Sequence, residues 1–418
     1  MNQKVANIRT KFFNNKKIAE NYFFMTFLQG AGLLVGLLLY PYLIRVLGKE
    51  VYGTYIFILS NIQLFSLFIS FGFTFPALKQ ISLYPKDKVV KETVLSEVFT
   101  AKILLLLFSS LLFLIVIRVV PFVQKNAILY LITFSTVLVD ILFPQWYFQG
   151  IQKMKFVTYV NLTLRLLTIP FIFIFIKSPS DIQKYALITS IFPILGGIFS
   201  FFYLQLKENI QIRFVSFSRL KPLFTNALPF FWTSAVESLK TNTVTFIIGV
   251  FFNMQEVAIW DLANKIVLIP RTITTSINSA LFPNLVNNFN PPRVRKVIKY
   301  NRLISITVSL LVIVSGYWAV LVLGGKTMLA SYPIAVVLSF SIYTWLVVGA
   351  YINIVFVARG KYKFVTISHL LAYLFFILLT MMGLLVCEKI IILAAALVIA
   401  DLLVGIYCHY IVKKHELL

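Results

Sequence analysis

Twelve apolar stretches, nearly all at least 20 residues long, follow one another along the 418-residue chain. A hydrocarbon core about 30 Å thick requires roughly 20 apolar residues in a helix that rises about 1.5 Å per residue. Each stretch therefore predicts one crossing of an all-α integral membrane protein. The expected spans are Asn21–Arg45, Tyr52–Leu78, Thr93–Ile117, Ala127–Phe148, Phe156–Ile176, Ile182–Leu206, Leu223–Phe252, Val257–Val286, Leu303–Leu323, Leu329–Ala358, Phe364–Val386 and Ile390–Val412.

The composition agrees with a chain surrounded by membrane lipids. Hydrophobic residues make up 60% of the sequence and charged residues 12%, and the mean hydropathy is +0.90. A net charge of +24 would also suit a nucleic-acid-binding protein. Such a protein needs a soluble basic module, and none fits between the spans, so we expect no nucleic acid partner.

Most of the basic residues describe orientation. Of the 38 Lys and Arg residues, 25 lie in one set of alternate loops and eight in the other set. Cytoplasmic loops of membrane proteins are enriched in Lys and Arg. We therefore expect both termini and the basic connector between spans six and seven to lie in the cytoplasm.

The two halves of the chain also show a weak internal repeat. An offset of 205 residues aligns Asn21 with Asn226 and brings Glu50-Val51 close to Glu256-Val257. Two six-helix lobes related by an axis along the membrane normal would produce this pattern, although apolar sequences also align by chance. The predicted organisation is an N-terminal lobe (residues 1–206), a connector (207–222) and a C-terminal lobe (223–418).

The chain lacks the residue patterns of metal sites, disulfides and common enzymes. Cys387 and Cys408 fall near opposite ends of the last two spans, too far apart for a disulfide. No His or Cys spacing suits a metal. The sequence also contains no phosphate-binding Gly-rich loop, His-Glu-x-x-His or Gly-x-Ser-x-Gly motif. We expect a protein that is not an enzyme and that is not driven by ATP on its own.

Ionisable residues inside the spans provide the functional signal. Each costs at least about 2.5–3.5 kcal/mol on insertion scales, so those that occur usually face protein or a water-filled cavity. The basic ones are Lys102, Arg165, Lys240, Lys265 and Arg271, and the acidic ones are Glu97, Asp140, Glu237, Asp261 and Asp401.

Local pairing explains some of these charges. Glu237 precedes Lys240 by three residues and Asp261 precedes Lys265 by four, so both pairs are candidates for salt bridges within one helix. The cations Lys102, Arg165 and Arg271 have no such neighbour. Their partner must be a residue of another helix, a backbone carbonyl or a bound anion, and we expect a substrate with phosphate or pyrophosphate.

Span one carries a small-residue face formed by Gly30, Gly32 and Gly36. Small residues at this spacing allow another helix to approach closely. Helix packing alone is sufficient to explain them.

Several short motifs resemble the Wzx polysaccharide flippases of the multidrug/oligosaccharidyl-lipid/polysaccharide exporter superfamily. The likeness covers roughly the first 290 residues, and the rest fits mainly by hydropathy. The motifs are Asn21-Tyr22, Gln29-Gly30, the Tyr40–Gly48 run, Tyr52-Gly53-Thr54-Tyr55, Phe71-Gly72-Phe73, the Trp146–Met154 turn, Asn242–Gly249, Glu256–Lys265 and Ala280-Leu281-Phe282-Pro283.

The resemblance implies a V-shaped transporter of two six-helix lobes that works by alternating access in the bacterial cytoplasmic (inner) membrane. The implied substrate is an undecaprenyl-pyrophosphate-linked oligosaccharide used for O-antigen, capsule or exopolysaccharide. A polysaccharide polymerase and glycosyltransferases are the implied protein partners.

On this resemblance, all five embedded cations, Lys102 among them, are candidates for substrate binding. The acids Asp140, Glu237 and Asp261 would balance charge or couple a proton or Na⁺, and no other cofactor or metal is expected. Members of the family commonly carry aromatic and small residues at the Trp260-Asp261 step. Asp261 is therefore a candidate for either specificity or local pairing.

Two other functions remain open from the sequence. A cation-coupled multidrug exporter of the same superfamily would prefer an anionic lumen, against which the embedded cations argue. A membrane scaffold or glycosyltransferase subunit would need a soluble domain or paired catalytic carboxylates in a loop, and neither is evident.

Overall fold

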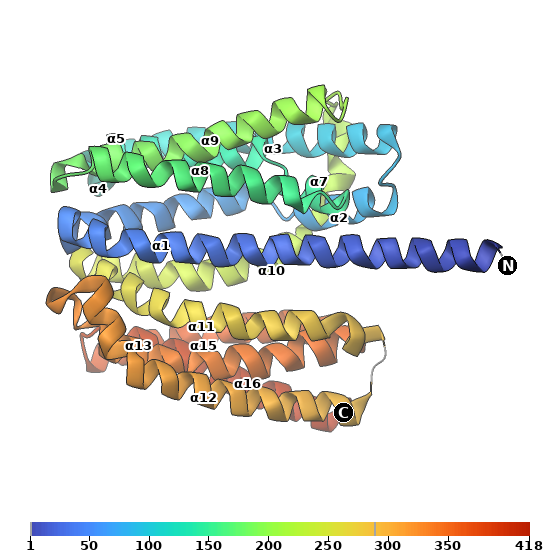
Figure 1. Ribbon diagram of the computed structural model, residues 1–418. Coiled ribbons are helices and arrows are strands. Elements are labelled where there is room, and N and C mark those ends of the chain that lie inside the picture. Colours follow the sequence, from blue (N-terminus) through green and yellow to red (C-terminus); the bar gives the residue numbers. More distant parts are fainter. Residues whose placement is uncertain (1, 288–289) are drawn as a thin grey trace. The chain divides into compact units, whose positions relative to one another are not determined.

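The computed structural model describes residues 2–287 and 290–418, and side chains other than those of residues 2–19, 22, 275–287 and 362. Every regular element in this part of the chain is helical (Figure 1). Nine of these helices are long and apolar enough to cross a membrane, which confirms the all-α integral membrane fold.

The twelve expected spans fall on helices of the described chain, although a non-helical turn at residues 71–73 interrupts span two. Span four is broken into four pieces and span ten contains two π-helical segments. The elements are α1 (Asn2–Ser70), α2 (Thr74–Leu83), α3 (Lys88–Val119), α4 (Pro121–Lys125), α5 (Ala127–Phe134), η1 (Ser135–Val137), α6 (Leu138–Leu142), α7 (Gln145–Gly150), α8 (Met154–Phe175), η2 (Pro179–Asp181), α9 (Ile182–Leu206), α10 (Phe217–Phe251), α11 (Met254–Asn287), α12 (Pro291–Gly324), η3 (Lys326–Met328), α13 (Ser331–Ser339), α14 (Ser341–Tyr343), η4 (Thr344–Val348), η5 (Tyr351–Phe356), α15 (Tyr362–Val386) and α16 (Ile391–Lys414).

Span one and residues 52–70 of span two lie in α1, and span two then continues through a turn at residues 71–73 into α2. The two spans are separated at Gly48, whose φ of 75° and ψ of 162° are not helical. A positive φ of this kind is readily adopted only by glycine, so a single residue can make the break between the two helices.

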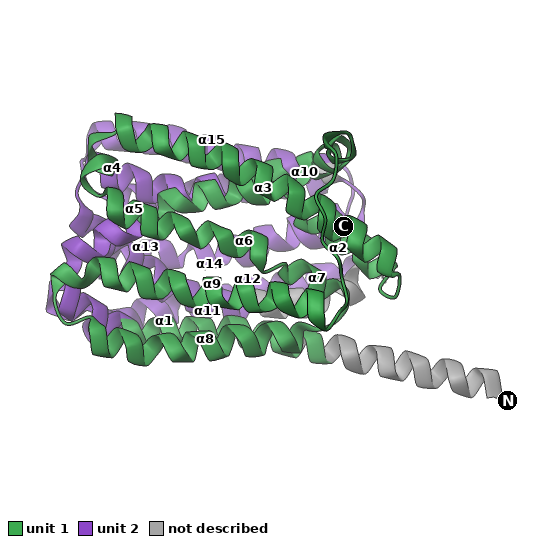
Figure 2. Ribbon diagram, turned by 90° about the horizontal axis from the view of Figure 1, so that it is seen from above, with its two compact units in different colours: residues 1–39, 58–235 green, residues 40–57, 236–418 purple. Residues whose placement is uncertain are grey.

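The helices form two compact units (Figure 2). Unit 1 contains residues 1–39 and 58–235, and unit 2 contains residues 40–57 and 236–418. The contacts thus assign the Gly48 turn to the second unit and the first half of α10 to the first. The division into sequence lobes at 206 and 223 stays a prediction.

Within unit 1, the connector between α9 and α10 runs extended along α3. The backbone N–H groups of Gln211, Arg213 and Val215 donate hydrogen bonds to the side chains of Glu92, Ser96 and Thr100. Alternate residues of an extended segment and every fourth residue of a helix each face one way, so the two periods match. This ladder fixes the start of α10, which begins at Phe217 inside the expected connector.

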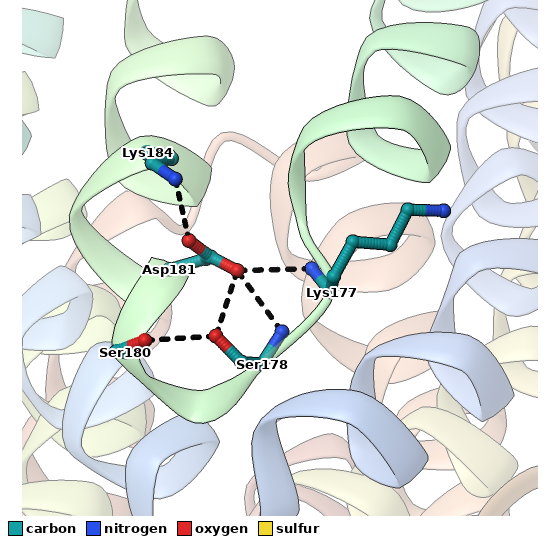
Figure 3. A network of polar contacts seen from close by, with 5 residues as sticks. All are labelled: Lys177, Ser178, Ser180, Asp181 and Lys184. Carbon is teal, nitrogen blue, oxygen red and sulfur yellow. Dashed lines mark hydrogen bonds and ion pairs between the residues drawn. The ribbon is translucent and has the colours of Figure 1, made fainter.

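The start of α9 is held by a local polar network (Figure 3). The Asp181 carboxylate accepts hydrogen bonds from the backbone N–H groups of Lys177 and Ser178 and from the Lys184 ammonium group. The bond from the Ser178 N–H group is one half of a capping box at the start of η2, in which the Ser178 side chain accepts from the Asp181 backbone in return. This acid is therefore explained by helix capping.

Candidate functional site

The five embedded cations are distributed over both units. Lys102 on α3 and Arg165 on α8 belong to unit 1, whereas Lys240 on α10 and Lys265 and Arg271 on α11 belong to unit 2. Each unit therefore has its own set of polar contacts.

Lys102 is satisfied by a backbone carbonyl. Its side chain is buried, and its Nζ donates a hydrogen bond of 2.6 Å to the carbonyl oxygen of Asp140. This carbonyl is free because Pro144, four residues further along, has no N–H to donate to it. Of the three partners that the sequence left open for Lys102, the structure contains the carbonyl of another helix.

The Asp140 carboxylate has a different partner. It accepts a hydrogen bond from the hydroxyl group of Ser66. Beside it lies a cavity of about 10 Å³, about the size of one water molecule, lined in part by Lys102, Asp140 and Trp146. Within the described residues, the Trp146 Nε1 donor has no hydrogen-bond partner. A carboxylate beside a water-sized cavity is suited to exchanging a proton.

Arg165 lies over Gly32 of α1. A Cβ atom at Gly32 would come within 1.8 Å of Arg165 Nη1, so the glycine leaves room for the guanidinium group. A Cβ at Gly30 or Gly36 would meet nothing within 4 Å. The absence of a side chain at Gly32 therefore makes room for the Arg165 side chain and not for close packing of a helix backbone. No ion pair or hydrogen bond to the Arg165 side chain is found in the described part of unit 1.

Lys240 pairs with an acid of another helix. Its ammonium group contacts the Asp401 carboxylate of α16, and the two side chains are 18% and 12% exposed. The candidate salt bridge between Lys240 and Glu237 does not form among the described residues. The Asp401 carboxylate lies within hydrogen-bonding distance of Lys240, and Glu237 forms no ion pair within 4 Å there.

Glu237 nevertheless takes part in a wider charge cluster of unit 2. His369 on α15 interacts electrostatically with Glu237, Lys240 and Asp401. Arg271 interacts electrostatically with Asp401 and Glu237. Charged side chains of α10, α11, α15 and α16 therefore act on one another in one polar cluster, in which Lys240 and Asp401 are in direct contact.

Arg271 stacks on an aromatic ring at this cluster. Its Cζ lies 4.0 Å from the ring centroid of Trp345, in the π-helical segment η4. Stacking uses the flat face of a guanidinium group and leaves its N–H donors at the edge. Among the described residues, no acid lies within 4 Å of these donors.

Lys265 and Asp261 form the intrahelical pair expected from their spacing. The Tyr52 hydroxyl donates a hydrogen bond of 3.1 Å to Asp261 and accepts one of 2.9 Å from Lys265. The Lys265 Nζ also lies 4.9 Å from the ring centroid of Tyr40. These contacts show local pairing of Asp261 and enclose Lys265 between two aromatic rings and a carboxylate.

Close backbone packing supports this second cluster of unit 2. A Cβ atom at Gly53 would lie 1.7 Å from the carbonyl oxygen of Met254 and 3.3 Å from the backbone nitrogen of Ala258. Residues 53 and 258 differ by 205, the offset of the internal repeat.

The structure adds residues to which the sequence interpretation assigned no role. Asp401 had a signal, because it is the only acid in its span and has no basic neighbour one turn away. Tyr40, Tyr52 and Trp345 had none, since aromatic residues are frequent throughout this chain. The role of the five cations in substrate binding stays a prediction.

Comparisons with known proteins identify a family and several relatives of this chain. The model of a family described as "Polysaccharide biosynthesis protein" matches residues 18–289. An O-antigen transporter, so named, of Escherichia coli (strain K12) is 25% identical over 321 residues, or 77% of this chain and 76% of its own length. A protein of the same name from Shigella dysenteriae is 26% identical over 275 residues, or 64% of this chain and 67% of its own.

Solved structures share the fold. A lipid II flippase in an inward closed conformation has a TM-score of 0.73 at 18% identity and covers 94% of this chain and 87% of its own. An inward-facing multidrug resistance transporter of the MATE family has a TM-score of 0.67 at 13% identity, covering 93% and 94% of the two chains.

Proposed function

Because the chain belongs to the polysaccharide biosynthesis protein family, we propose that it moves polyprenyl-pyrophosphate-linked oligosaccharides from the cytoplasmic to the outer leaflet of the bacterial inner membrane. The protein is a multi-pass membrane transporter of polysaccharides, not an enzyme. We further propose that its substrate is lipid-linked, that it works by alternating access and that both of its termini lie in the cytoplasm. The glycosyltransferases and the polymerase would act before and after this step.

The observation that carries the proposal is the Arg271 guanidinium group on Trp345. A stacked guanidinium group is held in one plane, and its free edge presents two parallel N–H donors that match a phosphate. The surrounding acids, Glu237 and Asp401, interact with it only at longer range. A pyrophosphate can therefore bind Arg271 without first breaking an ion pair.

The acids are proposed to couple transport to a proton or Na⁺. Asp140 accepts a hydrogen bond from Ser66 while Lys102 uses the backbone carbonyl, so its carboxylate has room for a proton or cation. Glu237 is exposed and forms no close ion pair in the described part of unit 2. Asp261, held by Lys265 and Tyr52, balances charge instead.

The test of the function is a deletion strain. Lipid-linked repeat units should accumulate on the cytoplasmic face and surface polysaccharide should disappear, and both should be restored by the wild-type gene. Restoration by the Lys326→Ala variant provides the control, because Lys326 lies in the short helix η3, outside the clusters. Normal surface polysaccharide in the deletion strain would contradict the proposal. Greater drug susceptibility with normal polysaccharide would instead identify a multidrug exporter.

Gly32→Ala should reduce transport as much as Arg165→Ala does. The new methyl group would occupy the position of Arg165 Nη1, so the guanidinium group must move away. Loss of one charge-assisted hydrogen bond predicts a decrease of about tenfold or more in transport by proteoliposomes. Gly36→Ala is the matched control, since its methyl group meets nothing within 4 Å. Equal activity of both alanine variants would show that the position of Arg165 is unimportant.

A further inference from the structure

A separate cavity of about 480 Å³ lies in unit 1 between α2, α3 and α10. Its lining includes Gln80 from α2, Glu97 from α3, and Arg219 and Asn226 from α10. Volumes of this size accommodate small organic groups. None of the five cations discussed above lines it, so it is distinct from the candidate substrate site.

The cavity contains opposite charges that do not neutralise each other directly. Glu97 and Arg219 interact electrostatically. No ion pair within 4 Å joins them, as judged over the described residues. Arg219 is exposed and Glu97 is partly buried. A cavity with a separated cation and anion complements a molecule that carries both an anion and a cation.

An apolar surface continues from this cavity. Phe75 precedes the lining residue Pro76, and Phe230 follows the lining residue Asn226 by four positions on the same face of α10. The two rings stack with centroids 5.2 Å apart, and their side chains are 54% and 40% exposed. Exposed aromatic rings beside a polar cavity suit a ligand with an apolar chain attached to a polar head.

The residues that line the cavity lie next to basic segments, as expected for a site that binds a lipid headgroup. Gln80 follows Lys79, and Arg219 precedes Lys221 by two residues, both in segments that the charge distribution assigns to the cytoplasmic side. The connector ladder on α3 fixes the first turn of α10, which bears Arg219. On the expected topology, Arg219 therefore belongs to the cytoplasmic end of α10, where phosphates of the cytoplasmic leaflet are accessible.

We propose that this cavity binds the headgroup of a zwitterionic phospholipid with a primary ammonium group. Arg219 binds the phosphate and Glu97 accepts hydrogen bonds from the ammonium group, while one acyl chain lies on Phe75 and Phe230. A quaternary ammonium headgroup has no N–H donor for Glu97. A glycerol headgroup has no positive charge.

Native mass spectrometry of the purified full-length protein, titrated with defined lipids, tests the proposal. Phosphatidylethanolamine should bind at least about tenfold more tightly than phosphatidylcholine or phosphatidylglycerol, as expected for a hydrogen bond between charged groups. Glu97→Gln should abolish the preference for phosphatidylethanolamine over phosphatidylcholine, and Arg219→Gln should weaken all three lipids. Lys221→Gln, which removes an exposed charge outside the cavity lining, should change neither the preference for phosphatidylethanolamine nor the affinity for the three lipids.

A further variant separates loss of lipid binding from loss of folding. Asn226→Phe places bulk in the cavity without leaving a charge unpaired, and it should reduce lipid binding while the thermal unfolding midpoint stays near the wild-type value. Equal binding of the three lipids by the wild-type protein would overturn the proposal. Free phosphoethanolamine binding as tightly as the lipid would also overturn it, because the site would then recognise a soluble molecule.

Discussion

Arg271→Ala should lower transport of the lipid-linked oligosaccharide by about 10- to 100-fold, because a hydrogen bond to a charged group contributes about 1.5–3 kcal/mol. The guanidinium group is stacked on Trp345 at 4.0 Å, with no acid within 4 Å in the described structure. Its loss therefore removes free donors without leaving a close partner unpaired. Rates in proteoliposomes, together with the yield of folded protein, measure the effect.

Two further variants separate charge from geometry. Arg271→Lys keeps the charge but loses the two-donor fork, so it should recover only part of the rate. Trp345→Leu leaves the arginine without its stacking partner and should also reduce transport. Lys326→Ala, in the short helix η3 of the same unit, should transport normally. If Arg271→Lys were fully active, the planar fork would have no role in recognition.

The fold could be predicted because the membrane imposes length and hydropathy on each span. The expected spans fall on helices, and the Gly48 break lies between the first two, but hydropathy did not predict the turn at residues 71–73 within span two. The exact ends were less predictable. The start of α12 at Pro291, twelve residues before the expected span, is helical but basic and polar, and hydropathy does not report helix outside the hydrocarbon core.

The contacts of the site were predictable only where they are local. The Asp261–Lys265 pair follows from its spacing of four residues. The free carbonyl of Asp140 also follows from Pro144, four residues later, although its contact with Lys102 depends on how α3 packs. Lys240 and Asp401, by contrast, are 161 positions apart. The spacing of residues within one helix does not determine which acid of another helix will contact Lys240.

The Lys240–Asp401 pair should be important for folding as well as for the charge cluster. Lys240→Ala leaves Asp401 partly buried and without its close partner, a change that costs about 3–5 kcal/mol for a buried pair. The remaining exposures of 18% and 12% place the expected loss at the lower end of that range. The thermal unfolding midpoint of the purified protein measures it.

Lys265→Ala is the matched comparison for this prediction. Its partner Asp261 keeps the hydrogen bond from the Tyr52 hydroxyl, so the loss of stability should be smaller than for Lys240→Ala. The double variant Lys240→Met/Asp401→Leu removes both charges and should regain most of the stability lost by the single variants. If it were as unstable as the sum of the single variants, the two charges would be energetically independent. If it were stable but transported poorly, the pair would have a second role in transport, because Asp401 also interacts electrostatically with Arg271.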